Sequence, residues 1–376
     1  MTSGRLPITG AGETRIDEQV KPDRHATLEA IARAAGVHVS TVSRVLNAGP
    51  DTAGRAASQQ TAAKIHRLAG EMRYRPNPLG VGLRTQRTQS IAVLVPRLAD
   101  IVLATIYEGI EAAATKHGYT TFVANTHDNP QERRERAEMA LSARVDGLIF
   151  GDADADSQFL DDLAGHGTPF VLVSRHSGQY PSITCDDYLG GCMAATHLLE
   201  MGHTQVAVIA GEPYASTGID RTQGFLDTYE KGGISLDSKK VVHSRFDAPG
   251  GRDAAQRLLR TKPFPTAIFV VNDFAAIGLL GVLRDKGLQA GQDIAVVGFN
   301  DTPLARELPV PLTSVRSPMS EMGAASVDLL IALLAGEPAH SRKLMPELMV
   351  RASSNPTLRQ PEPAESVRAS LHSPKR

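Results

Sequence analysis

Tryptophan is absent from the 376 residues, and only two cysteines occur. Two thiols are too few for a disulfide framework, so we expect buried, reduced cysteines. No apolar run approaches the roughly 20 residues that a membrane helix needs, and the polar N-terminal stretch lacks the apolar core of a signal peptide. These absences predict a cytoplasmic protein without a membrane partner.

Net charge is almost absent too, because 40 Lys and Arg face 41 Asp and Glu and leave a formal charge of −1. This balance is the average of two unlike regions. Residues 24–89 contain ten Lys or Arg and three acids, a net charge of +7, so the remaining residues sum to −8. A basic segment on an acidic body indicates a polyanionic partner for that segment, although a solvated surface would have the same composition.

The motifs of common enzyme classes are missing as well. The sequence has no G-x-S-x-G elbow, no P-loop and no G-x-G-x-x-G after a strand. The segment GDADADSQ imitates a calcium loop through Asp152, Asp154 and Asp156 but lacks the glycine and glutamate that such a loop needs, so we interpret it as a solvated loop. We interpret QERRERAE as a charged helix face. No His or Cys cluster has metal-ligand spacing, and we expect no enzyme activity, cofactor or metal.

Residues 27–88 have the pattern of short helices without a strand. Thr27 can cap a first helix, Gly36 can end it in the left-handed conformation, and a third helix is expected from Thr61 to Met72. Between them, VHVSTVSRVLN has apolar residues at helical spacing on one face and polar ones on the other. Two helices joined by a tight glycine turn form a helix-turn-helix, whose second helix enters the major groove of DNA. An ordinary helical hairpin is the alternative.

Residues 90–356 alternate between strand and helix patterns. Amphipathic patterns such as those at 106–116, 191–201 and 274–286 separate apolar, β-branched segments typical of buried parallel strands. The expected strands are SIAVLVP, TTFVANT, VDGLIF, PFVLVSR, QVAVIAG, TAIFVVND and IAVVGFND. This alternation predicts a doubly wound α/β fold, and the region is too long for one such sheet. We therefore expect an α/β core of two lobes with parallel sheets and a cleft between them.

The stretch ATLEAIARAAGVHVSTVSRVLN resembles the N-terminal signature of the LacI/GalR (lactose-repressor/galactose-repressor) family of bacterial transcription regulators. YRPNPLGVGLRTQRT looks like that family's hinge helix, and the resemblance continues, in the expected order, through DGLIF, LLEMGHTQVAVIAG, DRTQGF, TAIFVVNDFAAIG and DIAVVGFND. It implies a regulator, usually a repressor, whose binding to DNA is controlled by a small molecule. The implied fold is an all-α helix-turn-helix head with a hinge helix, followed by a two-lobed periplasmic-binding-protein-like core.

The resemblance also implies the division of the chain. We expect a disordered N-terminal extension (1–25), a helix-turn-helix domain (26–76), a hinge helix and linker (77–89), an effector-binding and dimerisation core (90–356) and a disordered tail (357–376). Within the core, lobe 1 takes about 90–187 and 317–343, and lobe 2 takes about 188–316 and 344–356.

The partners implied by the resemblance are double-stranded DNA, a small-molecule effector and a second copy of the chain. Two heads of a homodimer bind a pseudo-palindromic operator, and paired hinge helices enter its minor groove, where Leu83 matches the leucine that wedges into a base step. The sequence has no C-terminal leucine heptads, so a dimer is expected rather than a tetramer. Binding to DNA would place the protein at the nucleoid.

On the head, the resemblance assigns DNA contacts residue by residue. The base-reading positions match Val39, Ser40 and Arg44. The phosphate-contacting positions match Thr27, Ser43 and Asn47. His38 departs from the family, which usually has a serine capping the recognition helix there. A protonated His38 would contact a phosphate, and a plain exposed turn residue is the alternative.

In the core, the family binds its effectors in the cleft. The matching positions are Asp100, Val102, Arg175, Arg221, Phe246, Asn272 and Asn300. Asn300 stands where the family usually has aspartate, and DIVL replaces an NPFF-like segment, so both alter the pattern that the ligand must match. A sugar is the first expectation, and a nucleoside or purine acting as corepressor is the second. A cytoplasmic small-molecule-binding protein without a role on DNA is a further alternative.

Overall fold

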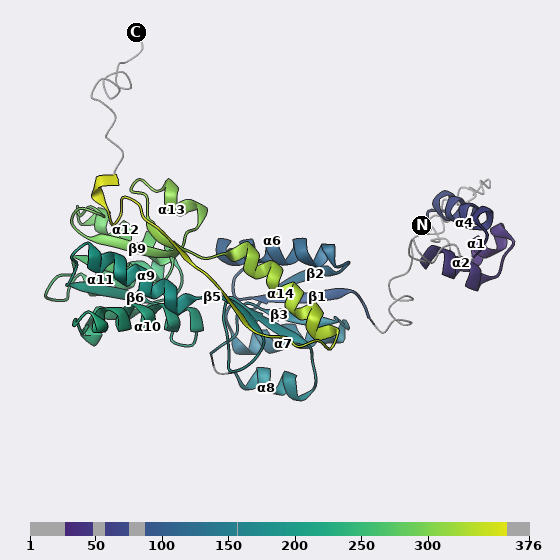
Figure 1. Ribbon diagram of the computed structural model, residues 1–376, viewed down its shortest axis with the longest axis horizontal. Helices are drawn as coiled ribbons and strands as arrows, with labels where there is room; N and C mark the ends of the chain where they lie inside the picture. The colour runs from purple at the N-terminus through teal and green to yellow at the C-terminus, as the bar shows by residue number, and fades with distance from the viewer. Residues whose placement is uncertain (1–26, 48–56, 75–86, 156, 359–376) are drawn as a thin grey trace, which may run out of the picture. The chain divides into compact units, whose positions relative to one another are not determined.

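The computed structural model describes residues 27–47, 57–74, 87–155 and 157–358, which belong to two compact units, one up to Arg84 and one from Thr85 onward (Figure 1). The described part of the first unit, called the head below, has three helices: α1 (Leu28–Ala35), α2 (Val39–Asn47) and α4 (Gln59–Glu71). The expected extension, most of the hinge with Leu83, and nearly all of the tail lie outside the described residues.

Local capping sets the helix ends of the head. The Oγ1 atom of Thr27 accepts a hydrogen bond from the backbone N–H of Ala30, and Gly36 ends α1 with φ = 72°. Both features follow the prediction from sequence. The third helix begins at Gln59, earlier than predicted, because Ser58 caps it by accepting from the backbone N–H of Thr61. A small core centred on Ile31, Val42 and Ile65, all fully buried, holds the three helices together.

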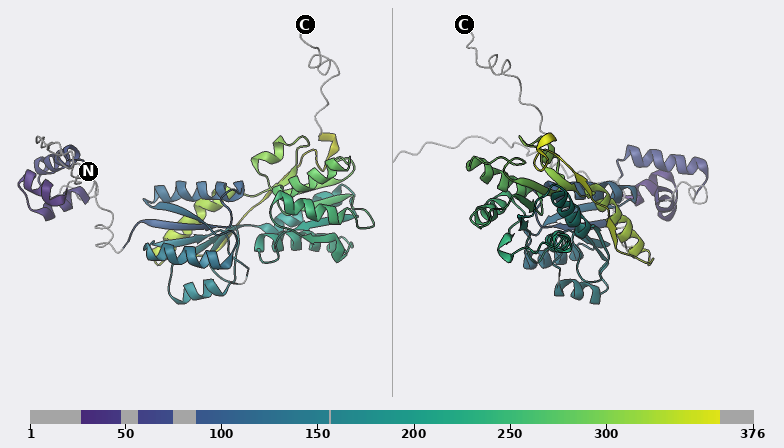
Figure 2. Two further views of the ribbon diagram at one scale, coloured as in Figure 1. Left: turned by 180° about the vertical axis from the view of Figure 1, so that it is seen from behind. Right: turned by 60° about the vertical axis from the view of Figure 1, so that its left-hand side comes forward.

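The second unit, called the core below, contains two six-stranded sheets in separate lobes (Figure 2). The first sheet is parallel throughout and has the order β11-β5-β4-β3-β1-β2. Its strands are β1 (Ser90–Val95), β2 (Thr120–Asn125), β3 (Gly147–Phe150), β4 (Phe170–Val173), β5 (Ser182–Cys185) and β11 (Arg342–Leu344). Its helices are α6 (Ile101–Lys116), α7 (Pro130–Ser142), α8 (Gln158–Gly165) and α14 (Met319–Leu334).

The second sheet has the order β12-β10-β9-β8-β6-β7, with β12 antiparallel to β10 and the other pairs parallel. Its strands are β6 (Val206–Ala210), β7 (Val241–His243), β8 (Ala267–Val270), β9 (Ala295–Asn300), β10 (Thr313–Arg316) and β12 (Glu347–Met349). The helical elements that follow or flank it are α9 (Asp187–Glu200), α10 (Ser216–Lys231), η1 (Ser238–Lys240), α11 (Ala248–Leu258), α12 (Asp273–Asp285), α13 (Pro303–Glu307) and η2 (Pro356–Leu358).

Helices cover both faces of each sheet, which explains why the strands are apolar on both faces. In β1, Val93 packs toward α6 and α14, whereas Leu94 packs toward α7 and α8. In β6, Val208 packs toward α9 and α10, whereas Ile209 packs toward α11 and α12. All four side chains are fully buried, as expected for a doubly wound sheet.

The chain crosses between the lobes three times, from β5 to α9, from β10 to α14 and from β11 to β12. The seven predicted strands are all present. The structure adds β5, β7, β10, β11 and β12, which have three or four residues each and include polar or charged residues, so they lack the contiguous apolar run of the predicted strands. Among the described residues, no helix is both long and apolar enough to span a bilayer.

Candidate functional site

The first candidate site is the exposed N-terminal end of α2 in the head. His38 precedes the helix and Ser40 lies in its first turn, and both side chains are exposed. The Nδ1 atom of His38 lies 3.2 Å from the backbone nitrogen of Ser40 and 2.8 Å from its Oγ atom. A backbone N–H can only donate, so Nδ1 acts as the acceptor and the ring proton sits on Nε2. The His38 side chain therefore caps α2.

The other predicted DNA-binding residues of the head lie along the same helix or at the start of α1. Arg44 is exposed, and its Nε donates to the backbone oxygen of Ser40 over 3.3 Å. Val39 and Ser43 are half-buried, and Thr27 is exposed at the start of α1. The backbone of Asn47 ends α2, but its side chain, like all of Leu83, lies outside what the structure describes.

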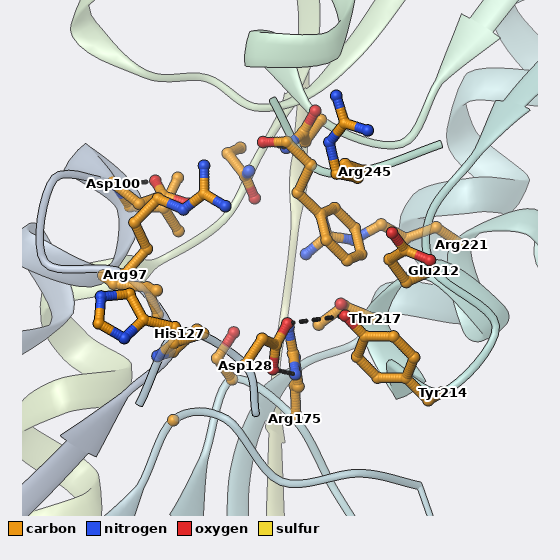
Figure 3. Close-up of a pocket in the computed structure, with 18 residues that line it drawn as sticks. Arg97, Asp100, His127, Asp128, Arg175, Glu212, Tyr214, Thr217, Arg221 and Arg245 are labelled. Carbon is orange, nitrogen blue, oxygen red and sulfur yellow. Dashed lines mark hydrogen bonds and ion pairs between the residues drawn. The ribbon is translucent and has the colours of Figure 1, made fainter. Parts of the chain in front are cut away.

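The second candidate site is a cleft in the core with a cavity of about 210 Å³. Its lining comes largely from segments that follow the carboxyl ends of strands in both sheets, the usual place for ligands in open α/β folds. The structure brings all seven predicted cleft residues into this lining: Asp100, Val102, Arg175, Arg221, Phe246, Asn272 and Asn300. Figure 3 shows the side chains converging from both lobes.

Arg175 forms a two-pronged ion pair in the cleft. It follows β4, is 5% exposed, and its two terminal nitrogens donate to the two carboxylate oxygens of Asp128 over 2.7 and 2.8 Å (Figure 3). Tyr214, from the other lobe, donates its hydroxyl to Oδ2 of Asp128 over 3.1 Å. Burial opposes ionisation of Asp128, but the Arg175 guanidinium outweighs it and holds the pKa of this carboxyl below its usual range.

Arg133 supports Asp128 from α7. Its guanidinium lies 3.9 Å from Asp128 and binds Asp152 through Nε and Asp154 through both terminal nitrogens. Asp152 also accepts a hydrogen bond from the buried Thr126. Arg133 is 1% exposed and Asp152 fully buried, so the predictions of a charged helix face and a solvated loop were wrong for these two residues. The charges are buried because they neutralise each other across two elements. Asp156 lies outside the described residues.

Arg221 is buried on α10. Its Nε donates to Oδ1 of Asp187 over 2.7 Å, and Nη1 donates to the backbone oxygen of Val271 over 2.8 Å. The guanidinium carbon lies 3.7 Å from the centroid of the Phe299 ring, a cation–π distance. Burial raises the pKa of Asp187 to about 6, and the attraction of Arg221 offsets only part of that effect.

Asn300 is the last residue of β9, Asn272 follows the neighbouring strand β8 by two residues, and both side chains are buried. Asn272 caps α12 by accepting from the backbone N–H of Ala275, and its amide donates to the backbone oxygen of Phe246. The Oδ1 atom of Asn300 is buried and has no hydrogen-bond partner in the described structure. Its backbone has φ = 101°, a conformation that L residues rarely adopt. A buried acceptor without a partner is costly unless a ligand or water supplies a donor.

Phe246 presents an aromatic ring to the cleft because two glycines lie beneath it. A Cβ on Gly211 would lie 2.5 Å from the ring, and one on Gly218 would lie 2.9 Å from Gly211 itself. Arg175 lies 5.9 Å from the same ring. At the opposite side of the cleft, Asp100 caps α6 by accepting from the backbone N–H of Val102, and burial raises the pKa of its carboxyl.

Sequence reasoning missed several polar residues that line the cleft. They are Arg97, His127, Asp128, Glu212, Tyr214, Thr217 and Arg245. Most of them lie within a few residues after a strand, and this position alone was a usable signal. His127, Asp128, Ser174 and Asn300 also have left-handed backbones, and such strain often accompanies a functional site. In the part of the chain that the structure describes, no group of three or more His, Cys, Asp or Glu is arranged to hold a metal ion.

Comparisons with known sequence families match both candidate sites. The profile described as "Bacterial regulatory proteins, lacI family" matches residues 27–77, which include α2. The profile described as "Periplasmic binding protein-like domain" matches residues 195–354, which include much of the cleft.

Whole-chain relatives extend the similarity over both units. The transcriptional regulator DegA of Bacillus subtilis strain 168 is 32% identical over 337 residues, which cover 88% of this chain and 98% of DegA. The transcriptional repressor PurR of Haemophilus influenzae strain PittEE is 28% identical over 335 residues, which cover 87% of this chain and 98% of PurR.

Solved structures show the same likeness. The lac repressor dimer bound to operator and the anti-inducer ONPF has a TM-score of 0.80 and 26% identity, and the match covers 88% of this chain and 100% of that one. The regulator CelR in its cellobiose complex has a TM-score of 0.66 and 30% identity, and the match covers 87% of this chain and 99% of that one.

Proposed function

This chain belongs to the lacI family of bacterial regulatory proteins, and we propose that it is a transcriptional repressor whose operator binding is controlled by a small molecule in the cleft of the core. The observation that carries this proposal is the convergence of seven residues, drawn from positions 100 to 300, on one cavity in a chain that also has a helix-turn-helix. We propose no catalytic role, because the relatives are regulators.

The head supports the DNA-binding part of the proposal. The exposed polar face of α2 presents Ser40 and Arg44, whereas the valines of the opposite face are buried against α1 and α4. A slim helix with hydrogen-bonding groups at its N-terminal end fits the major groove. Arg44 has the planar donor fork that binds guanine, and Thr27 and Ser43 have hydroxyls suited to phosphates. We assign Asn47 and the hinge residue Leu83 to the same interface by family position alone.

The cleft supports a sugar as the effector. Guanidinium and carboxylate groups lie side by side in its lining. A sugar hydroxyl can donate a hydrogen bond to the carboxylate and accept one from the guanidinium. Phe246 offers an apolar surface for a sugar ring. The cavity of about 210 Å³ suits a small ligand, since pockets for drug-sized ligands measure roughly 300–1,000 Å³. The CelR structure, with cellobiose, adds a sugar-binding relative.

We propose the following division of the chain: a helix-turn-helix domain at 26–76, a hinge at 77–89 and an effector-binding core at 90–356. The lac repressor structure is a dimer on its operator, and we propose that this chain also acts as a homodimer on a pseudo-palindromic site. A DNA partner places it in the cytoplasm, at the nucleoid.

Selection of bound sequences from a random duplex library tests the proposal with the full chain at near-physiological salt. We expect a pseudo-palindrome whose two halves match two copies of the head. The matched control is Arg44→Ala, which should lose preference at one base pair of each half-site. Binding that is sequence-blind, or unaffected by Arg44→Ala, would contradict the assignment of α2 as the reading helix.

A purine corepressor is the second candidate, favoured by the PurR relatives. Titration of sugars and of purines against the selected operator distinguishes the two. A sugar that releases the protein from DNA supports the first proposal, and a purine that tightens binding supports the second.

A further inference from the structure

Four arginines line the cleft, and so many cations would ordinarily indicate an anionic ligand. Each of them, however, already has a carboxylate partner within the described residues. The side-chain distances range from 2.7 to 3.5 Å. The pairs are Arg175–Asp128, Arg221–Asp187, Arg97–Asp247 and Arg245–Asp247.

The cleft contains further acceptors beyond these pairs. Asp100 and Glu212 line it and form no ion pair with any described residue. The buried Oδ1 of Asn300 has no partner there either. The four guanidinium groups are therefore outnumbered by five carboxylates. Three of these carboxylates (Asp128, Asp187 and Asp247) are paired with an arginine, and two (Asp100 and Glu212) are not. Asp100 already accepts from the backbone N–H of Val102, but a carboxylate can accept several hydrogen bonds, so the cleft best matches a ligand that donates to these groups.

Asp128 takes the place at Arg175 that a ligand anion would need. Its two oxygens meet the two terminal nitrogens of Arg175 in a fork, which is how a carboxylate or phosphate binds arginine most strongly. Three features hold Asp128 in this place. Its backbone has φ = 57°, Tyr214 donates to it from the other lobe, and Arg133 lies 3.9 Å away.

We propose that Asp128 acts as a built-in counter-anion that makes the cleft selective for uncharged, donor-rich effectors and excludes phosphorylated or carboxylated ones. This inference rests on the proposed function, because it assumes that the cleft is the effector site. Asp128 is then a specificity-determining residue. An anionic ligand would have to displace a carboxylate from a buried arginine and would also face Asp100 and Glu212.

The test uses inorganic phosphate and sulfate as probes, so that it does not depend on knowing the effector. Calorimetric titration and thermal unfolding of the full chain are compared with those of Asp128→Asn. Asparagine keeps the size of the side chain, tolerates the left-handed backbone and can still accept from Tyr214, but it leaves Arg175 without a counter-charge. We expect Asp128→Asn to bind phosphate at least about tenfold more tightly than the wild type does.

The matched control is Asp220→Asn. Asp220 accepts a hydrogen bond from His176 over 2.9 Å and is paired with no arginine among the described residues, so its loss should not create a phosphate site. Saturable phosphate binding by the wild type that Arg175→Gln abolishes would overturn the proposal. So would an Asp128→Asn protein that unfolds cooperatively and gains no affinity. The wild-type measurement stays decisive if the variant fails to fold.

A second arm compares neutral compounds with their anionic derivatives, such as glucose with glucose 6-phosphate and adenosine with its 5′-monophosphate. A derivative that binds the wild type more tightly than its parent would overturn the inference. Operator selection separates this outcome from failure of the proposed function. If the protein selects an operator but binds a phosphorylated effector more tightly, the proposed function holds and the counter-anion inference fails. If Asp128→Asn gains phosphate affinity but no operator is selected, the counter-anion inference holds and the proposed function fails.

Discussion

Arg221 and Asp187 form a buried ion pair of 2.7 Å across the contact between two helices, α10 and α9. The helices approach closely because glycines stand at their crossing. A Cβ on Gly191 would lie 2.1 Å from the backbone oxygen of Arg221, and one on Gly224 would lie 2.0 Å from that of Tyr188. The position of a charged pair in the cleft therefore depends on residues without side chains.

Gly224→Ala should lower the free energy of unfolding by about 1–3 kcal/mol, because its methyl group would overlap backbone atoms that cannot move independently. Urea denaturation of the full chain measures this change. The control is Gly165→Ala at the end of α8, where a Cβ meets no atom within 4 Å. We expect the control to change stability by less than about 1 kcal/mol. Equal effects of the two substitutions would show that the helix contact is looser than described.

Arg221→Lys should also destabilise the core, by about 1.5–3 kcal/mol. Lysine keeps the charge but cannot bind Asp187 and the Val271 carbonyl with the same planar group, and it cannot stack on Phe299 in the same way. Arg284→Lys is the matched control, because Arg284 has a 76% exposed side chain paired with its neighbour Asp285. A stability change below about 0.5 kcal/mol is expected there. The prediction fails if Arg221→Lys is as mild as its control.

The raised pKa of Asp187, about 6, should appear in the pH dependence of stability. Because burial raises this pKa above the value of an unfolded aspartate, the folded state binds a proton that the unfolded state does not between about pH 4 and 6. The stabilisation from proton uptake is fully present below about pH 4 and is lost as pH rises through 6. Asp187→Asn should remove this contribution, so its unfolding free energy should fall less than that of the wild type between pH 4.5 and 7.5. Urea titrations at fixed pH measure both slopes, and identical slopes would contradict the assignment.

His38→Ala should weaken operator binding, because it removes the acceptor that caps α2, the helix that we propose reads the operator. Loss of an N-cap costs about 0.5–2 kcal/mol of helix stability, which corresponds to a roughly 2- to 30-fold rise in the dissociation constant if the helix must be formed to bind. His38→Ser should retain most of the affinity, since serine supplies another capping oxygen. Fluorescence anisotropy at constant salt measures the three constants. Equal affinities of the alanine and serine variants would show that capping of α2 by residue 38 does not affect DNA binding.

Much of the fold follows from local patterns in the sequence. Thr27 and Gly36 mark the ends of α1 because a cap and a left-handed turn depend on the residues beside them. The strands β1, β6, β8 and β9 were predictable because their apolar residues are contiguous and punctuated by polar ones. The short strands β7, β11 and β12 were not, because three residues become a strand only when a neighbouring strand supplies their hydrogen bonds.

The sequence by itself determined that Asn272 and Asn300 stand at or just after the ends of buried apolar segments, and its resemblance to a family assigned both of them and Arg221 to the cleft. The tertiary structure alone decided which charges neutralise one another. Asp128 and Arg175 are 47 residues apart, and Arg133 reaches Asp152 from another element. No local spacing encodes such pairs, because they form when the folded core excludes water and each buried charge must find its opposite.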